Sequence, residues 1–252
     1  LRAVARAEAK VVSEYATPLG LLELRQLLTR RMAGLGIEAQ SGQIILTDSG
    51  TQAIDLIMRF LLTPGDTVVV DDPCYFNFHA LLRAHRVKVV GVPYTSNGPD
   101  ADVFATTLAE HKPRLYITNA AIHNPTGATL SPANAYRVLQ LAQEAGFYII
   151  EDDLFAHFAI PPVPRLAALD GLSRVFYIGS CSKTLSASLR CGYIAAPSEW
   201  VESLLDLKIA TGFGGSQLAA AVVLSALTDN GYRKHMGTVN IRLAKARTQT
   251  IP

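Results

Sequence analysis

The sequence has few cysteines and no long apolar run. Its three cysteines, Cys74, Cys181 and Cys191, are odd in number and lack Cys-x-x-Cys spacing, so a reduced, cytoplasmic compartment is the simplest interpretation. No stretch approaches the roughly 18 uninterrupted apolar residues of a membrane-spanning helix, and no signal-peptide pattern opens the chain. We therefore expect no membrane partner.

Charge is also scarce. Charged residues make up 17% of the 252 residues, the net charge is +2 and no basic cluster stands out, so nothing favours a nucleic-acid surface. Hydrophobic residues make up 49%, and a chain of this length can bury a sizeable core as one domain or slightly more. Because the first residue is Leu1 and the last segment ends abruptly, we expect the chain to be part of a longer protein.

Short apolar runs alternate with helical patterns along most of the chain. We interpret as strands the segments 44–47, 67–71, 87–92, 114–118, 147–150, 175–178 and 192–196. Helical patterns cover 53–62, 75–85, 102–111 and 131–145, and continue from residue 198 to a basic stretch at 231–247. This alternation predicts an α/β fold with a mainly parallel sheet sandwiched by helices.

Polar residues gather where the predicted strands end. Ser49 to Gln52 follow one strand, Asn124 follows another, and Asp152 and Lys183 each close a strand. An open α/β sheet binds ligands beyond the carboxyl ends of its strands. These residues are therefore predicted to share one site.

Gly50, Thr51 and Gln52 open a predicted helix directly after a strand. Exposed N–H groups and the helix dipole make such a turn a natural anion site. A simple helix cap is the alternative interpretation. Since no Gly-Lys-Ser or Gly-Lys-Thr run is present, a nucleotide P-loop is not favoured.

Lys183 follows an apolar strand and has hydroxyl-bearing neighbours at Ser180, Ser182 and Thr184. A desolvated lysine has a lowered pKa and becomes a nucleophile toward an aldehyde, and the planar fork of Arg190 could hold a phosphate. An ordinary surface lysine and arginine are one alternative. The Ser-x-x-Lys motif of penicillin-binding enzymes is another, but the Ser-Asp-Asn and Lys-Thr-Gly motifs that accompany it are missing.

Asp152 lies in the acidic run 151–153. A carboxylate beside a pyridine nitrogen keeps the ring protonated and preserves its capacity as an electron sink. The run could instead bind a metal or form a solvated loop, but no nearby His pair has ligand spacing, and we predict no metal.

Asn124, in Asn-Pro-Thr-Gly, could donate an amide N–H to a phenolic oxygen or only form a turn. Tyr75 could stack on a pyridine face or belong to the core.

In this order and context, the motifs resemble the large domain of fold-type I enzymes that depend on pyridoxal 5′-phosphate (PLP), and specifically the class I/II aminotransferases. The narrower resemblance is to the aminotransferase-like module of MocR/GntR-type regulators and to 2-aminoadipate/kynurenine aminotransferases. It runs from about Tyr15 to Arg247.

The resemblance implies a role for each candidate residue. Lys183 would carry the internal aldimine, with Asp152 at the pyridine nitrogen, Asn124 at the phenolic oxygen and Tyr75 on the ring face. The phosphate would be held by Gly50, Thr51, Gln52, Ser180, Ser182 and Arg190. Tyr15 of the partner subunit would reach the same phosphate, which implies a homodimer.

The chain departs from the family pattern in three ways. Leu154 and Phe155 stand where the family usually has a tyrosine that bonds to the phenolic oxygen. The small C-terminal domain and the N-terminal segment that closes over the substrate are both expected to be missing. The resemblance divides the chain into an N-terminal segment 1–30, a PLP-binding large domain 31–229, and residues 230–252 as the start of the helix that leads to the small domain.

The expected function is PLP-dependent transfer of an amino group between an amino acid and a 2-keto acid. One alternative is a PLP-binding effector module of a MocR-type transcriptional regulator, with DNA binding left to another domain. Another is a different PLP reaction, such as decarboxylation or elimination. Because the segments that grip the substrate are expected to be missing, the chain should bind PLP better than it turns over amino acids.

Overall fold

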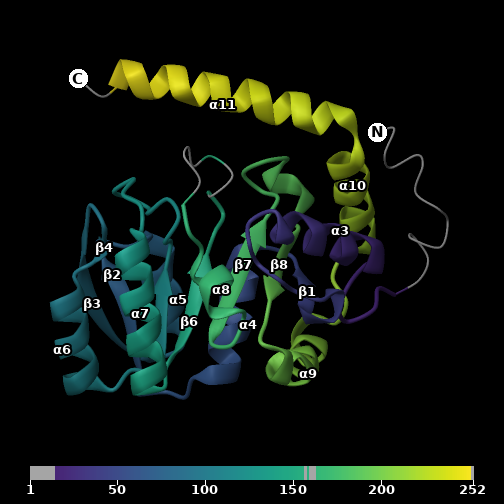
Figure 1. Cartoon of the computed structure of the whole chain (residues 1–252). Helices are drawn as coiled ribbons and strands as arrows, with labels where there is room; N and C mark the ends of the chain where they lie inside the picture. The colour runs from purple at the N-terminus through teal and green to yellow at the C-terminus, as the bar shows by residue number, and fades with distance from the viewer. Residues whose placement is uncertain (1–14, 156–157, 159–162, 251–252) are drawn as a thin grey trace.

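An eight-stranded sheet forms the centre of the molecule (Figure 1). The computed structural model describes residues 15–155, 158 and 163–250. The strand order is β1-β8-β7-β6-β5-β2-β3-β4. The strands are β1 (Ile44–Thr47), β2 (Thr67–Asp72), β3 (Lys88–Thr95), β4 (Gly98–Pro99), β5 (Leu115–Thr118), β6 (Tyr148–Asp152), β7 (Val175–Ser180) and β8 (Gly192–Ala195).

Strand direction determines which chain segments meet at one edge of the sheet. Strands β3, β2, β5, β6 and β7 are parallel to their neighbours in this series. Strand β8 is antiparallel to both β7 and β1, so β1 runs in the same direction as β7. The carboxyl ends of these parallel strands therefore share one edge, together with the amino end of β8.

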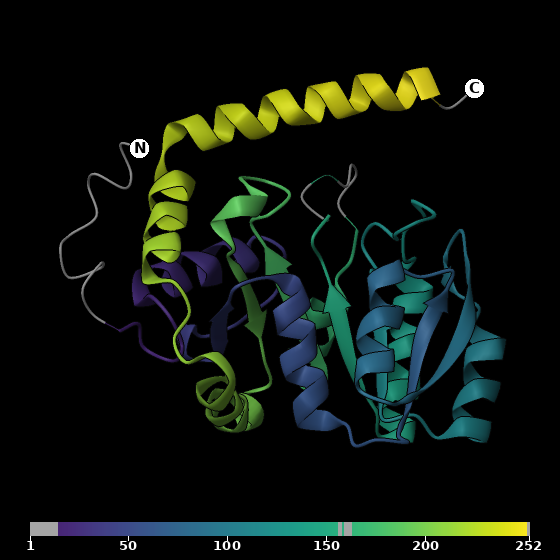
Figure 2. The same ribbon diagram turned by 180° about the vertical axis from the view of Figure 1, so that it is seen from behind.

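Helices cover both faces of the sheet (Figures 1 and 2). One layer contains α3 (Leu22–Ala33), α6 (Ala101–His111), α7 (Pro132–Ala145) and α8 (Leu166–Asp170). The other contains α4 (Gly50–Leu61), α5 (Phe76–Ala84) and α9 (Val201–Gly212), while α10 (Gln217–Thr228) packs against α3. Side chains alternate between the two faces, as Ile149 and Ile150 do, and two hydrophobic cores result.

Local sequence signals determine where several helices begin and end. The Ser131 side chain accepts the Asn134 N–H at the start of α7, Pro132 lies in the first turn, and Gly146 ends the helix in the left-handed conformation. At the start of α4 the Ser49 side chain accepts the Gln52 N–H. This cap fixes the geometry of the predicted anion turn.

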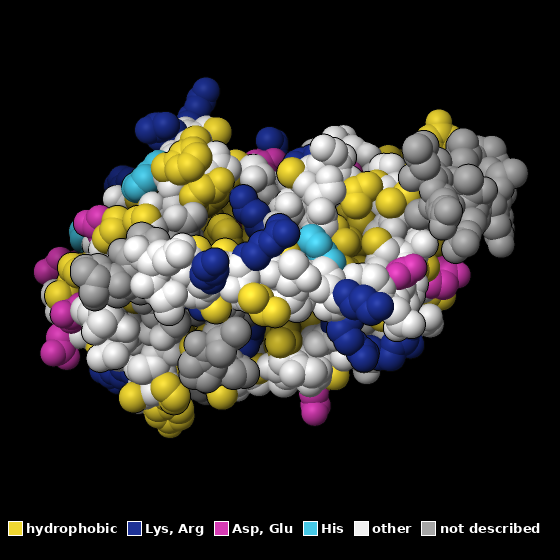
Figure 3. All heavy atoms as spheres, turned by 90° about the horizontal axis from the view of Figure 1, so that it is seen from above, with side chains coloured by type: hydrophobic (Ala, Val, Ile, Leu, Met, Phe, Trp, Pro, Cys, Tyr) yellow, Lys and Arg dark blue, Asp and Glu magenta, His cyan; other side chains and the backbone are white. Residues whose placement is uncertain are grey.

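Helix α11 (Asn230–Thr250) lies over the carboxyl edge of the sheet (Figure 1). His235 Nε2 lies 3.2 Å from the carbonyl oxygen of Thr184, and the Arg247 guanidinium donates to the carbonyl of Phe158 at 2.9 Å. Seen from above, Lys and Arg side chains mark this side of the molecule (Figure 3). The predicted basic helix at 231–247 is confirmed.

The predicted α/β fold and its seven strands are confirmed, but α3, α8 and β4 were not predicted from the sequence. The predicted divisions after residues 30 and 229 stay predictions, and residues 1–14 and 251–252 of the outer segments lie outside the described residues. Helix α3 crosses residue 30 and buries Leu24, Leu28 and Met32. Within the described ranges, no helix is long and apolar enough to cross a membrane.

Candidate active site at the carboxyl edge

Asp152 is the last residue of β6, and its carboxyl group is buried with 6% of the residue exposed. The Leu154 N–H donates to its Oδ1 at 3.3 Å, and the Asn119 side-chain amide donates to its backbone carbonyl at 3.1 Å. Burial raises the pKa of Asp152 to about 7, while the hydrogen bonds and the charge of Lys183 act in the opposite direction. A cationic group placed beside this carboxyl would be stabilised by it.

The other two acidic residues of the run face the opposite side of the sheet. Each carboxylate oxygen of Glu151 accepts a backbone N–H from the first turn of α8, both at 2.8 Å. Asp153 Oδ2 lies 3.3 Å from Arg165 Nε and accepts the Tyr177 hydroxyl at 2.6 Å. These two carboxylates are structural, and the residues that the structure describes include no group of three or more His, Cys, Asp or Glu placed to hold a metal.

Lys183 lies in the loop between β7 and β8, three residues beyond the end of β7. Its Nζ lies 5.6 Å from the centre of the Phe155 ring, and its charge acts on Asp152. The sequence predicts a desolvated lysine, whereas the Lys183 side chain is exposed. The expectation of burial is therefore wrong, because the loop places the amine at the open edge of the sheet.

Two serines fold the start of the same loop. Ser180 Oγ lies 3.1 Å from Ser182 Oγ and 3.2 Å from the carbonyl oxygen of Cys191, and it accepts the Ser182 N–H at 3.2 Å. These contacts place both predicted phosphate ligands on one turn. Arg190 ends the loop in the left-handed conformation with φ of 47°, and its side chain is exposed.

The turn before α4 lies directly against the start of β8. A Cβ atom on Gly192 would lie 2.7 Å from the Ser49 carbonyl carbon and 2.9 Å from the Gly50 nitrogen, so only glycine permits this approach. Gln52 uses its side-chain oxygen to accept the Asp48 N–H at 2.6 Å. Its backbone N–H donates to the Ser49 side chain at 3.0 Å, so both of these Gln52 groups hold the turn together. Thr51 is exposed, with its hydroxyl 3.5 Å from Asn77 Nδ2.

Asn124 and Tyr75 follow the next two strands, β5 and β2. Asn124 is half-buried in a turn in which the Gly127 N–H donates to the His123 carbonyl at 2.7 Å. Tyr75 is half-buried at the start of α5 and packs edge-on against Phe78, with 5.5 Å between ring centres. Both residues lie along the edge that carries Asp152.

Tyr15 lies apart from this group. Its side chain is 90% exposed and contacts the ring of Phe213, with 5.5 Å between the ring centres. The single chain thus leaves the Tyr15 hydroxyl free to meet another surface.

A buried polar cluster beside the site was not predicted from the sequence. Asp71, in β2, accepts the hydroxyls of Tyr116 at 2.5 Å and Thr118 at 2.7 Å, and lies 3.4 Å from His123 Nε2. The ring of Tyr94 stacks on His123 with 3.7 Å between centres. The cluster ties two strands to the turn that carries Asn124. The signal that could have revealed this cluster was the presence of polar residues inside apolar strand runs. For Asn119, the signal was its position directly after the end of β5.

Together the fold and the site define the class of protein. A mainly parallel sheet covered by helices, with an amine and a buried carboxyl at the carboxyl ends of its strands, matches the large domain of the fold-type I transferases. The family model of aminotransferase class I and II matches residues 1–251, and the chain belongs to this family.

Transcriptional regulators are among the curated relatives. The chain is 33% identical over 236 residues to the uncharacterized HTH-type transcriptional regulator YdfD of Bacillus subtilis. The match covers 92% of this chain and 49% of YdfD. It is 26% identical over 223 residues to the HTH-type transcriptional regulator NorG of Staphylococcus aureus, covering 88% and 50%. The chain thus spans about half the length of these relatives.

Aminotransferases are among the solved structures that the chain resembles. The kynurenine aminotransferase of Pyrococcus horikoshii, solved with PMP, is 25% identical with a TM-score of 0.87, covering 94% of this chain and 60% of that one. The aromatic aminotransferase of the same organism, at 22% identity and a TM-score of 0.90 over 98% of this chain and 68% of that one, shows the fold alone. The predicted family and fold are confirmed, and PLP is the cofactor that they indicate.

The residues present fit this cofactor. Asp152 is a buried carboxyl with a raised pKa, which suits a ring nitrogen that carries a proton. The turn before α4 is a helix N-terminus, which suits a phosphate, and the Gln52 N–H there already donates to Ser49. Lys183 supplies an amine between these two features along the edge.

Proposed function

We propose that the chain holds PLP at the carboxyl edge of its sheet and uses Lys183 to transfer an amino group between an amino acid and a 2-keto acid. The observation that carries this proposal is the pairing of a buried Asp152 with Lys183 at the ends of the adjacent strands β6 and β7. Neither side chain is explained by the packing of the core.

Each residue of the site would have one task. Lys183 would bind the aldehyde of the cofactor, and Asp152 would hold the proton on the ring nitrogen. Asn124 would donate to the phenolic oxygen, and Tyr75 would cover a ring face. The phosphate would be held by Gly50, Thr51, Gln52, Ser180, Ser182 and Arg190.

Bound PLP supplies a ring that withdraws electrons from the carbon that bears the amino group. The chain supplies proton transfer and electrostatics around it. Lys183 Nζ would move the proton from the substrate Cα, acting first as a general base and then as a general acid. Asp152, shielded from water, would stabilise a positive charge on the ring nitrogen when it is ionised.

A second candidate function is an effector module of a transcriptional regulator. Two observations favour it: curated relatives named HTH-type regulators are about twice as long as this chain, and Phe155 stands where a hydroxyl would tune the cofactor. In this case the amino acid would be sensed at the site without completed transfer. Both candidates require the same PLP-binding lysine and, with Tyr15 of the partner subunit, a homodimer.

A visible absorption titration with PLP tests the proposal. The expected result is a band that the Lys183→Ala variant lacks, and borohydride should trap the cofactor on the peptide that contains Lys183. Lys88→Ala is the matched control, because Lys88 is exposed at the first residue of β3, at the opposite edge of the sheet. A trapped adduct that persists in Lys183→Ala would refute the assignment.

A panel of amino acids then separates the two candidates. Amino-group transfer predicts that particular amino acids shift the band and release a keto acid that a coupled assay detects. An effector module predicts a shift of the band without a released keto acid. A band that no amino acid shifts would contradict both functions.

A further inference from the structure

Cys181 and Cys191 form a cross-strand pair at the base of the Lys183 loop. The register of β7 and β8 ends at Ser180 opposite Gly192, so the next residues along the two strands are the two cysteines. The Cys181 N–H donates to the Cys191 carbonyl at 3.0 Å, which continues the antiparallel ladder by one pair. Residues opposite each other in an antiparallel ladder direct their side chains to the same face.

The geometry of such a pair suits a disulfide. Hydrogen-bonded antiparallel pairs have Cα atoms about 5.5 Å apart, and disulfides most often join Cα atoms about 5.5–6 Å apart. Both side chains belong to the same hydrophobic core, each with 6% exposure. The two sulfurs can therefore be joined with little movement of the backbone.

The two thiols interact with each other and not with Cys74. A hydrogen bond from Cys191 lowers the pKa of the Cys181 thiol, and the same bond together with burial raises the pKa of Cys191. Cys74 lies elsewhere, 3.3 Å from His79 Nε2, and burial with the charges of Asp71 and Asp72 raises its pKa to about 11. Cys181 is thus the more nucleophilic thiol of the pair, while Cys74, with its raised pKa, serves as an internal reference.

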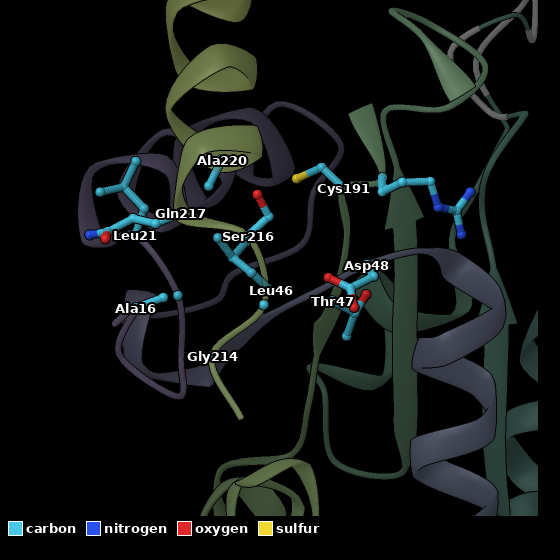
Figure 4. Close-up of a pocket in the computed structure, with 13 residues that line it drawn as sticks. Ala16, Leu21, Leu46, Thr47, Asp48, Cys191, Gly214, Ser216, Gln217 and Ala220 are labelled. Atoms are coloured by element: carbon cyan, nitrogen blue, oxygen red, sulfur yellow. The ribbon is translucent and has the colours of Figure 1, made fainter. Parts of the chain in front are cut away.

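Two small pockets border the pair. Cys191 borders the pocket of Figure 4, where its sulfur points toward the side on which Ala220 lies. Cys181 borders a second pocket, which Arg31 and Tyr232 also line. Each pocket holds about 20 Å³ of space, which is sufficient for a molecule of about the size of water.

We propose that Cys181 and Cys191 are a redox modification site that forms a reversible disulfide with a small peroxide as the oxidant. The Cys181 thiolate attacks one oxygen of hydrogen peroxide, the O–O bond breaks, and the departing hydroxide takes a proton to become water. Cys191 sulfur then attacks Cys181 sulfur, the S–O bond breaks, and a second water leaves with the Cys191 thiol proton. The two sulfurs together lose the two electrons that reduce the peroxide, and a dithiol reverses the reaction.

A disulfide between Cys181 and Cys191 would enclose residues 182–190 in a covalent loop. That segment carries Ser182, Lys183 and Arg190, so the redox state of the pair acts on the loop that holds three of the proposed cofactor contacts. In a reducing compartment such a pair stays open until an oxidant is present, as in redox-sensing proteins.

Thiol counting and peptide mass mapping of the peroxide-treated chain test the proposal. Trypsin cuts after Arg174, Lys183, Arg190 and Lys208, which separates Cys181 from Cys191. We expect the three free thiols to fall by two, and the peptides 175–183 and 191–208 to appear as a linked pair lighter by two hydrogen atoms. Dithiothreitol should restore all three thiols.

Three variants provide the controls. Cys74→Ser should form the linked pair as the unaltered chain does, and Cys181→Ser and Cys191→Ser should each abolish it. Three thiols that survive treatment, a link through Cys74 between two chains, or Cys181 oxidised to a sulfinic acid with Cys191 unchanged would each overturn the proposal. The measurement needs no cofactor, so its outcome is independent of the proposed function.

Discussion

Asp152 carries a carboxyl group that the fold buries and that the proposed function needs ionised. Its pKa is raised from the usual aspartate value of about 3.9 to about 7. Between these values the folded chain keeps a proton that the unfolded chain has lost, so the contribution of Asp152 to stability becomes steadily less favourable as the pH rises. The residue therefore destabilises the cofactor-free chain at neutral pH.

Asp152→Asn should stabilise the cofactor-free chain while impairing its chemistry. We expect the free energy of unfolding to exceed that of the unaltered chain by about 2–4 kcal/mol at pH 8, with a gain that shrinks as the pH falls from 7 toward 4. Urea unfolding across this range measures it. Asp206→Asn is the control, because Asp206 is exposed. A gain that does not vary with pH would contradict the burial of an ionisable group.

Phe155 offers a ring without a hydroxyl beside the Lys183 amine, at 5.6 Å. Phe155→Tyr should add one hydrogen bond to bound PLP and tighten its binding about twofold to tenfold, corresponding to about 0.5–1.5 kcal/mol. The absorption titration measures the change. Phe60→Tyr adds the same hydroxyl against Trp200 and should leave binding unchanged. Equal affinity in all three proteins would mean that Phe155 does not face the phenolic oxygen.

Individual residues differ in how far the sequence alone predicts them. Asp152 could be predicted because its strand end and acid run are local signals, and the structure places it at the site edge. The separate tasks of Glu151 and Asp153 could not be predicted, because they depend on α8 and Arg165, which fold against them from later in the chain. The exposure of Lys183 was also unpredictable, since it depends on the path of a loop.

At the scale of elements, β8 connects the phosphate turn to the lysine loop. Gly192 pairs with Thr47 of β1 and Ser180 of β7, and its missing side chain lets the turn at Ser49 lie against it. The strand was predictable from its apolar run. Its reversed direction was not, because direction is set by pairing with strands far apart in the sequence.

Gly192→Ala tests this close approach. The added Cβ meets backbone atoms that cannot rotate away, so we expect a loss of about 1–3 kcal/mol in the free energy of unfolding and weaker binding of PLP. Calorimetry and the absorption titration measure the two effects. Gly42→Ala is the control, because its Cβ would meet nothing within 4 Å. Unchanged stability would show that the turn and the strand can separate.

Short elements were the least predictable. Helix α8 has five residues, and its first turn is capped by Glu151 from another strand, so no local pattern announces it. By contrast α7 carries its own serine cap, proline and terminal glycine, and its predicted bounds are confirmed. Elements with their own caps are visible in the sequence, and elements capped from a distance are not.

At the scale of the whole molecule, the proposed function calls for a second copy of the chain to complete the site. The exposed Tyr15 hydroxyl is the group expected to cross between subunits. Tyr15→Phe should weaken binding of PLP about tenfold, the usual effect of losing a hydrogen bond to a charged group, and leave pyridoxal binding unchanged. Light scattering should give a dimer for both proteins. A monomer that binds PLP with full affinity would contradict a shared site.

Helix α11 has a mechanical consequence for this edge of the molecule. It is a rod of 21 residues, about 30 Å long, attached near one end to Thr184 and near the other to Phe158. A shift of one loop alone rotates the rod, whereas equal shifts of both loops translate it. The tilt of α11 therefore depends on the difference between the displacements of Thr184 and Phe158. The direction of the tilt shows which of the two has moved.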